Sequence, residues 1–225
     1  MATLIQLRQR MYYRLRDIPD PTDITVRTDA RIDDAMYDLW INASVTRIVT
    51  DTLCLEDTAT LTPDGVESAF VLAGAGADEV AADYIGLASI DHANGVIEEH
   101  PGGINAIRQL EVDGEIVAGD PVYYAIFGDM IYFDTIPPAD LTLNFFYYAA
   151  PTELALDADV PDTPIDLYTS LIVSGAISEF ADDEGDDNLM MRNESIYQKK
   201  LQTFRDRTEA HGKHQRKTGA DTNYL

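Results

Sequence analysis

The hydrophobic pattern of this chain changes its period twice. Near both ends, apolar residues recur every three to four positions, as on one face of a helix, whereas from Asp51 to about residue 150 they recur every second position, as on one face of a strand. One kind of secondary structure cannot satisfy both periods. We therefore predict an α+β fold, in which a helical bundle formed by the N-terminal and C-terminal helices carries an inserted antiparallel β-sandwich or small barrel domain.

Four helices are expected from stripes of apolar residues at helical spacing. They are residues 3–16, a helix capped by Thr28 or Asp29 that ends near Val49, a helix from Pro164 to about Ala181, and a last helix over 189–210. The prolines within 17–21 end the first helix, and Thr163 is placed to cap the third.

Strands are expected where β-branched and aromatic residues gather between turn signals. They cover residues 53–55, 69–72, 85–90, 104–112, 116–118, 121–127, 130–135 and 141–147. Gly128-Asp129 predicts a hairpin. Its shared face is expected to hold Tyr123, Ala125, Phe127, Ile131 and Phe133. The last strand is expected to bury Leu141, Leu143, Phe145 and Tyr147.

These expectations divide the chain into four parts. Residues 1–50 hold the N-terminal helices, 51–150 the inserted β domain, 151–211 the C-terminal helices, and 212–225 an extended basic tail that orders only against a partner.

Charge is segregated along the chain. Of the 40 acidic residues, 29 lie between Asp51 and Met191 with Arg108 as the single cation, whereas the other 15 Lys and Arg lie in the two ends. Such an acidic segment repels phosphate, so we expect it not to bind nucleic acid. Because 28 of the acids are Asp and only four residues are Lys, adaptation to high salt is an alternative explanation of the acidity.

No motif for catalysis or metal binding stands out. The four His and the single Cys54 lie in no known nucleophile or zinc pattern. The acidic run 182–187 lacks the spacing of a calcium loop, and the glycine-rich segment 74–78 has no Lys to hold a phosphate. No stretch reaches the roughly 18 apolar residues of a membrane span. We predict a soluble protein that is not an enzyme, with no cofactor, no metal and no membrane association.

The order of parts and several local sequences resemble a known family. The first helix reads Leu4-Ile-Gln-Leu-Arg-Gln-Arg-Met-Tyr-Tyr-Arg-Leu, the second ends in Leu39-Trp-Ile-Asn-Ala-Ser, and the insertion closes with Ile136-Pro-Pro-Ala-Asp-Leu-Thr-Leu-Asn-Phe-Phe-Tyr-Tyr-Ala-Ala-Pro151. A helix that closes in Phe-x-Asp-Asp-Glu then precedes a helix around Tyr197. Together they resemble the head-to-tail adaptor (connector) proteins of tailed bacteriophages and related archaeal viruses.

The resemblance implies a structural protein of the virion neck, made in the host cytoplasm. In that family a ring, usually of twelve subunits, lies beneath the portal protein, connects capsid to tail and contacts other neck or tail proteins. The ring continues the DNA channel used in genome ejection, and DNA passes through without specific binding. A C-terminal segment commonly docks onto the portal, which here assigns that role to Lys213, Arg216, Lys217, Tyr224 and Leu225.

Two other functions stay open from the sequence. In the first, the β domain is a host-recognition or decoration module of a virion, and the helices are an attachment stem. In the second, the chain is an acidic mimic of DNA or a salt-adapted enzyme.

Overall fold

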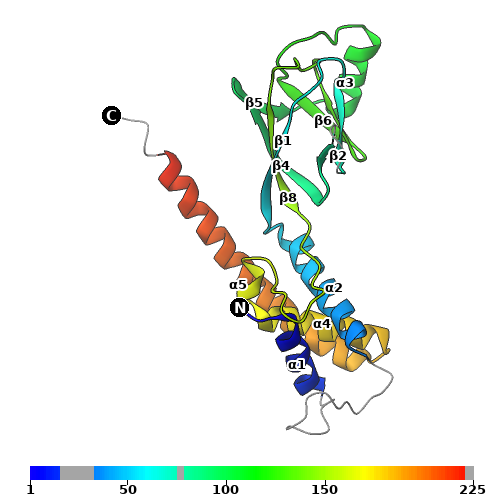
Figure 1. Ribbon diagram of the computed structural model, residues 1–225, viewed down its shortest axis with the longest axis vertical. Helices are drawn as coiled ribbons and strands as arrows, with labels where there is room; N and C mark the ends of the chain where they lie inside the picture. Colours follow the sequence, from blue (N-terminus) through cyan, green and yellow to red (C-terminus); the bar gives the residue numbers. More distant parts are fainter. Residues whose placement is uncertain (16–32, 75–78, 221–225) are drawn as a thin grey trace. The chain divides into compact units, whose positions relative to one another are not determined.

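The computed structural model describes residues 1–15, 33–74 and 79–220, with side chains described up to residue 208. Its contacts divide the chain into two compact units (Figure 1). Met1–Leu55 with Pro151–Leu225 form the helical unit, and Glu56–Ala150 form the barrel unit. The predicted α+β class is confirmed.

The helical unit contains four α-helices and a short 3-10 helix within the described residues. They are α1 (Leu4–Leu15), α2 (Asp34–Thr52), η1 (Ile165–Leu167), α4 (Thr169–Asp183) and α5 (Asp187–Ala220).

Several predicted helix ends differ from the observed ones. Asp33 caps α2 by accepting a hydrogen bond from the Met36 N–H at 2.9 Å, while the predicted caps Thr28 and Asp29 and the proline-containing stop at 17–21 lie outside the described residues. Pro164 precedes η1, so α4 begins only at Thr169. The last helix α5 continues to Ala220, about ten residues past its predicted end.

Helix α4 lies at the centre of the helical unit. It contacts α1, α2 and α5, and the eight residues from Leu171 to Ser178 are all buried. A helix buried all round must be small or apolar on every face, and α4 meets this condition with Ser174, Gly175, Ala176 and Ser178 among its apolar residues. Its small residues let neighbouring helices approach closely.

The closest approach to α4 involves Ser44 of α2. The Ser44 hydroxyl donates a hydrogen bond to the carbonyl of Ile172 at 2.8 Å, which satisfies this buried polar group. A Cβ placed on Gly175 would lie 2.2 Å from the Ser44 Oγ and 3.2 Å from the Tyr197 ring. Glycine at position 175 therefore sets how closely α2 and α5 pack on α4.

The barrel unit is built on an eight-stranded sheet within the described residues, and its strand order is β1-β8-β4-β5-β6-β7-β2-β3. The strands are β1 (Glu56–Leu61), β2 (Ala69–Ala73), β3 (Glu79–Ala81), β4 (Tyr84–His92), β5 (Gly95–Glu99), β6 (Tyr123–Phe127), β7 (Met130–Phe133) and β8 (Leu143–Ala149). The two end strands β1 and β3 contact each other, so the sheet is nearly closed and barrel-like. The segment 75–78 between β2 and β3 lies outside the described residues.

The sheet is mixed, which corrects the prediction of a purely antiparallel one. Strands β2 and β3 pair in parallel, and so do β5 and β6. Between β5 and β6 the chain forms helix α3 (Gly103–Val112), and a crossover of this kind allows the next strand to run in the same direction.

Three segments that we predicted as strands are not strands. Residues 104–112 form α3, because Ile104, Ile107 and Leu110 recur at helical spacing and outweigh the β-branched content. Within 53–55, Leu53 is the left-handed C-cap of α2, with φ 50°. Of residues 116–118, only Ala118 pairs, in an isolated bridge with Ile136.

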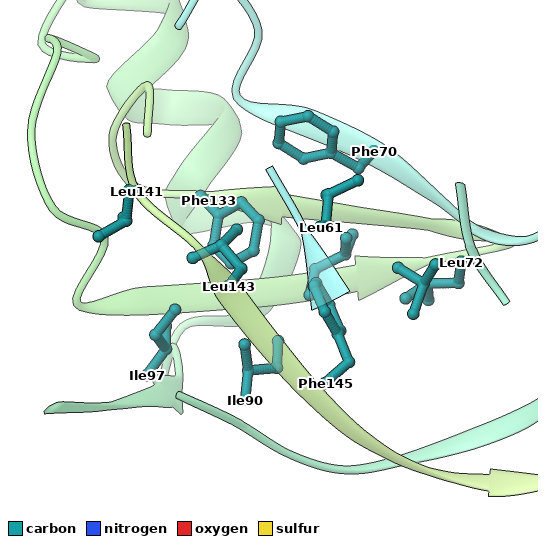
Figure 2. Packing of buried hydrophobic residues seen from close by; sticks show 11 residues of the cluster. Leu61, Phe70, Leu72, Ile90, Ile97, Phe133, Leu141, Leu143 and Phe145 are labelled. Atoms are coloured by element: carbon teal, nitrogen blue, oxygen red, sulfur yellow. The ribbon is translucent and has the colours of Figure 1, made fainter. Parts of the chain in front are cut away.

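The core of the barrel unit is one apolar cluster. It contains Leu61, Phe70, Leu72, Val80, Ile90, Ile97, Ile131, Phe133, Leu141, Leu143 and Phe145. Figure 2 shows residues of this cluster from several strands packed together. The predicted burial of Leu141, Leu143, Phe145 and Tyr147 is confirmed.

The predicted hairpin at Gly128-Asp129 forms, but the residues of β6 that share a face with Ile131 and Phe133 differ from the predicted ones. Its two-residue turn pairs Phe127 with Met130 and Ile126 with Ile131. Paired residues lie on the same face of a sheet. Ile131 and Phe133 therefore share the core face with Tyr124 and Ile126, and not with Tyr123, Ala125 and Phe127 as predicted.

Replacement of Gly175 by alanine tests the central packing. The added methyl group would meet the Ser44 hydroxyl, so Gly175→Ala is expected to destabilise the protein by about 1–3 kcal/mol, measured by urea denaturation. Gly119→Ala is the matched control, since its nearest neighbour would lie 3.9 Å away. Equal stability of the two variants would contradict this account of the packing.

Candidate functional site

Arg8 joins α1 to α2 through an ion pair with Asp38 that is largely shielded from solvent. Its Nε and Nη2 both donate to the Asp38 carboxylate, and Nη1 donates to Asp157 at 2.7 Å. The Arg8 side chain is only 10% exposed, and the hydrogen bond to Asp38 raises the pKa of its guanidinium. A two-pronged arginine–carboxylate pair of this kind fixes orientation as well as distance. Arg8 therefore holds α1 in one position against α2.

A second network joins α2, α4 and α5 around Arg47. Its guanidinium donates to both oxygens of Glu194, at 2.6 and 3.0 Å, and to Glu179 at 3.3 Å. It also lies 4.4 Å from the centre of the Tyr197 ring. Burial opposes ionisation of Glu194, yet hydrogen bonds from Arg47 and Gln198 lower the pKa of this carboxyl. Glu194 is thus ionised and held by its arginine.

A cavity of about 390 Å³ lies where α1, the start of α4 and α5 meet. We name it the basic pocket. Its lining residues are Arg10, Leu167, Tyr168, Thr169, Ser170, Leu171, Lys200, Thr203 and Arg207. Three of them are cations and none is acidic, which is unusual in a chain of net charge -24. The pocket is therefore a concentrated positive surface on an acidic protein.

The cations of the basic pocket are held in place without acidic partners. Lys200 Nζ donates to the Ser170 carbonyl at 2.6 Å and to the Ser174 hydroxyl at 2.9 Å, and the Arg207 guanidinium lies 5.9 Å from the Tyr168 ring. No carboxylate of the described residues forms an ion pair with any of the three. Burial, and then the charge of Arg14, lower the pKa of Lys200. A bound anion would relieve this uncompensated charge.

The acidic turn, residues 182–187, joins α4 to α5. Asp183 accepts a hydrogen bond from the Trp40 indole at 2.6 Å, and Asp186 caps α5 by accepting from the Leu189 N–H at 3.0 Å. Gly185 takes φ 70°, which favours glycine at the bend. All six residues of the turn are exposed. Within the described ranges, no group of three or more His, Cys, Asp or Glu side chains is placed to hold a metal ion.

The predicted docking residues fall on and beyond α5. Lys213, Arg216 and Lys217 lie on helical backbone, which corrects the prediction that residues 212–220 are extended. Tyr224 and Leu225 lie outside the described residues. The same helix carries Lys200 and Arg207 of the basic pocket.

Sequence reasoning missed the basic pocket. Arg10, Lys200 and Arg207 come from two helices far apart in the chain, so no local motif joins them. The only available signal was the concentration of cations in the two ends.

In this chain, helices precede and follow an inserted β unit. The resemblance to head-to-tail adaptors implies the same order of parts. A family model described as SU10 adaptor protein matches residues 2–222, and the chain therefore belongs to this family. The predicted relationship to phage head-to-tail adaptors is confirmed at the level of the family. A search of curated proteins found no match.

Membership of this family indicates a structural adaptor protein and a component of a phage virion, which interacts with other head and tail proteins. In the part of the chain that the structure describes, no helix has the length and apolar character needed to cross a membrane.

The Arg47–Glu194 pair predicts a pH dependence of stability. Because the folded-state pKa of Glu194 is lowered, its contribution is present above the unfolded pKa and is lost as the pH falls through the folded pKa. Glu194→Gln should therefore cost about 1 kcal/mol at pH 7, a value kept small by solvent screening. The difference in the free energy of unfolding between this variant and the unchanged protein should become smaller as the pH is lowered.

Urea denaturation of both proteins from pH 7 to pH 3 measures this effect. Glu153→Gln, at an exposed position, is the control and should show no such narrowing. A Glu194→Gln cost that does not vary with pH would argue against an ion pair as its source.

Proposed function

We propose that this chain forms a ring beneath the portal, connects the capsid to the tail and continues the DNA channel, with twelve copies in the virion neck. The observation that supports the proposal most is the match to the adaptor family over residues 2–222. In this proposal the helices around α4 act as a bundle that builds the ring wall. Firm ring walls require fixed helix positions, and the Arg8 and Arg47 networks supply them.

The charge of the chain suits a channel through which DNA must move. A wall rich in Lys or Arg would neutralise phosphates and hold DNA without regard to sequence, which would slow its passage. The barrel unit has 17 acidic residues against the single Arg108, so it offers no such surface. The net charge of -24 also makes free copies repel one another, which favours assembly on a portal over assembly in solution.

The end of α5 is proposed as the portal-docking segment. Lys213, Arg216 and Lys217 lie within five residues of one another near the end of this helix, followed in the sequence by Tyr224 and Leu225. Each exposed ion pair with an acidic portal surface would be weak. Repetition around a ring makes many weak contacts act together.

Native mass spectrometry of the protein with and without the portal ring of the same virus tests the function. A discrete complex with one adaptor per portal subunit is expected. Failure of the unchanged protein to associate with the portal would contradict the proposed function.

The triple variant Lys213→Glu, Arg216→Glu, Lys217→Glu tests the docking segment. It should lose portal binding, because each reversal replaces an attraction by a repulsion. Arg192→Glu with Lys199→Glu is the control, since both residues are exposed on the same helix but lie outside the docking segment. Equal portal binding by the triple variant and the control would rule out this segment.

Weak DNA binding is the other expected property. Fluorescence anisotropy of a labelled duplex at physiological salt should give an affinity weaker than about 10⁻⁴ M, the weak end of ordinary non-specific binding. Micromolar binding would contradict a channel wall that lets DNA pass.

A further inference from the structure

Helices α4 and α5 form a hairpin whose two ends carry opposite charge. They lie side by side (Figure 1), and the acidic turn joins the end of α4 to the start of α5. The basic pocket lies at the other end, at the first residues of α4 and at Lys200 to Arg207 of α5. The 15 residues of α4 separate the two ends by about 22 Å at 1.5 Å per residue. The acidic turn of one copy therefore cannot enter its own pocket.

The pocket is built to receive carboxylates. It presents Arg10, Lys200 and Arg207, none of them paired with an acid of the described residues, over a cavity of about 390 Å³. Leu167 on its rim is 67% exposed and adds an apolar surface. Cations that face one cavity and lack acidic partners attract an anionic group and discriminate against a cationic one.

The acidic turn supplies carboxylates that the fold does not use. Asp183 and Asp186 are occupied by Trp40 and by the cap of α5. Asp182, Glu184 and Asp187 are exposed, and their side chains form no hydrogen bond or ion pair with the described part of the chain. Met191, one turn further along α5, is 58% exposed and matches Leu167 as an apolar neighbour.

We propose that the basic pocket of one copy binds the acidic turn of a second copy of this chain. This inference deepens the proposed function and rests on it, because it names the contact between neighbouring subunits of the ring. The contact is head-to-tail: each copy uses its pocket toward one neighbour and its turn toward the other. Contacts of this type close into a ring when the rotation between copies permits.

The contact also reconciles assembly with strong net repulsion. Copies of charge -24 repel one another at long range, so two copies approach only where opposite charges face each other. The basic pocket of one copy and the acidic turn of another are surfaces of opposite charge, so they permit such an approach. It selects one orientation of the neighbours, since the turn-to-turn and pocket-to-pocket alternatives bring like charges together.

Charge reversal on the full chain tests the contact. The pocket variant is Arg10→Glu with Arg207→Glu, the turn variant is Asp182→Lys with Glu184→Lys, and the combined variant carries all four changes. Lys200, Asp183 and Asp186 are left intact because they make contacts within the fold. Circular dichroism and urea denaturation verify that each variant is folded.

Native mass spectrometry with and without the portal then counts the copies in each complex. We expect the pocket and turn variants each to raise the concentration needed for ring assembly at least about tenfold, and the combined variant to restore assembly, because its charges are complementary again. A mixture of the two double variants should form rings that alternate the two chains. Arg192→Glu with Lys199→Glu, which changes the net charge by as much as the pocket variant, should assemble normally.

Failure of the inference differs from failure of the proposed function. Rings that form equally well from the double variants, or no recovery in the folded combined variant, would overturn the pocket-to-turn contact while the adaptor function stands. A pocket variant that keeps the ring but loses another virion protein would also overturn it, and would assign the pocket to an acidic segment of that protein. If the unchanged protein forms no ring even with the portal, both proposals are wrong.

Cross-linking gives an independent readout. In a Cys54→Ser background, Glu184→Cys and Thr203→Cys place one thiol on the acidic turn and one on the pocket rim. A short bismaleimide should join successive copies of the doubly substituted chain into a ladder in portal-bound rings. Each single-cysteine chain should give at most dimers. A ladder absent from assembled rings would contradict the contact.

Discussion

The helical unit depends on the burial of α4. Eight consecutive residues of this helix are buried, and α1, α2 and α5 all pack on it. Gly175 allows Ser44 of α2 to reach the Ile172 carbonyl, so small residues set the spacing of the helices. At this spacing Arg8 reaches Asp38 and Arg47 reaches Glu194, each on a neighbouring helix. The basic pocket and the acidic turn then lie at the two ends of the α4–α5 hairpin.

The barrel unit is inserted without disturbing this packing because its own ends lie together. Its first and last strands pair, with Glu56 opposite Tyr148, so the chain leaves the helical unit and returns to it at neighbouring points. A closed or nearly closed sheet also leaves few unpaired edges, which limits unwanted pairing between copies. The insertion also has an apolar core of its own, part of which is drawn in Figure 2.

Charge gives the family assignment a physical meaning. In the proposed function the chain binds other proteins while DNA passes, and these demands conflict for a basic protein because phosphates compete for its cations. Here the acidic residues spread through the barrel unit and the acidic turn, whereas Arg10, Lys200 and Arg207 are gathered in one concave place. In the proposed contact this cavity receives the acidic turn of a neighbouring copy.

The sequence by itself determined the α+β class, the existence of four helices toward the two ends of the chain, the alternation that buries Leu143 and Phe145, and the segregation of charge, because these properties follow from local spacing and composition. Only the tertiary structure decided that two strand pairs are parallel and that Arg10 lines the same cavity as Lys200 and Arg207. Strand direction and pocket lining depend on contacts between residues far apart in the chain. A hydrophobic period records which face of an element is buried, but not what that face is buried against.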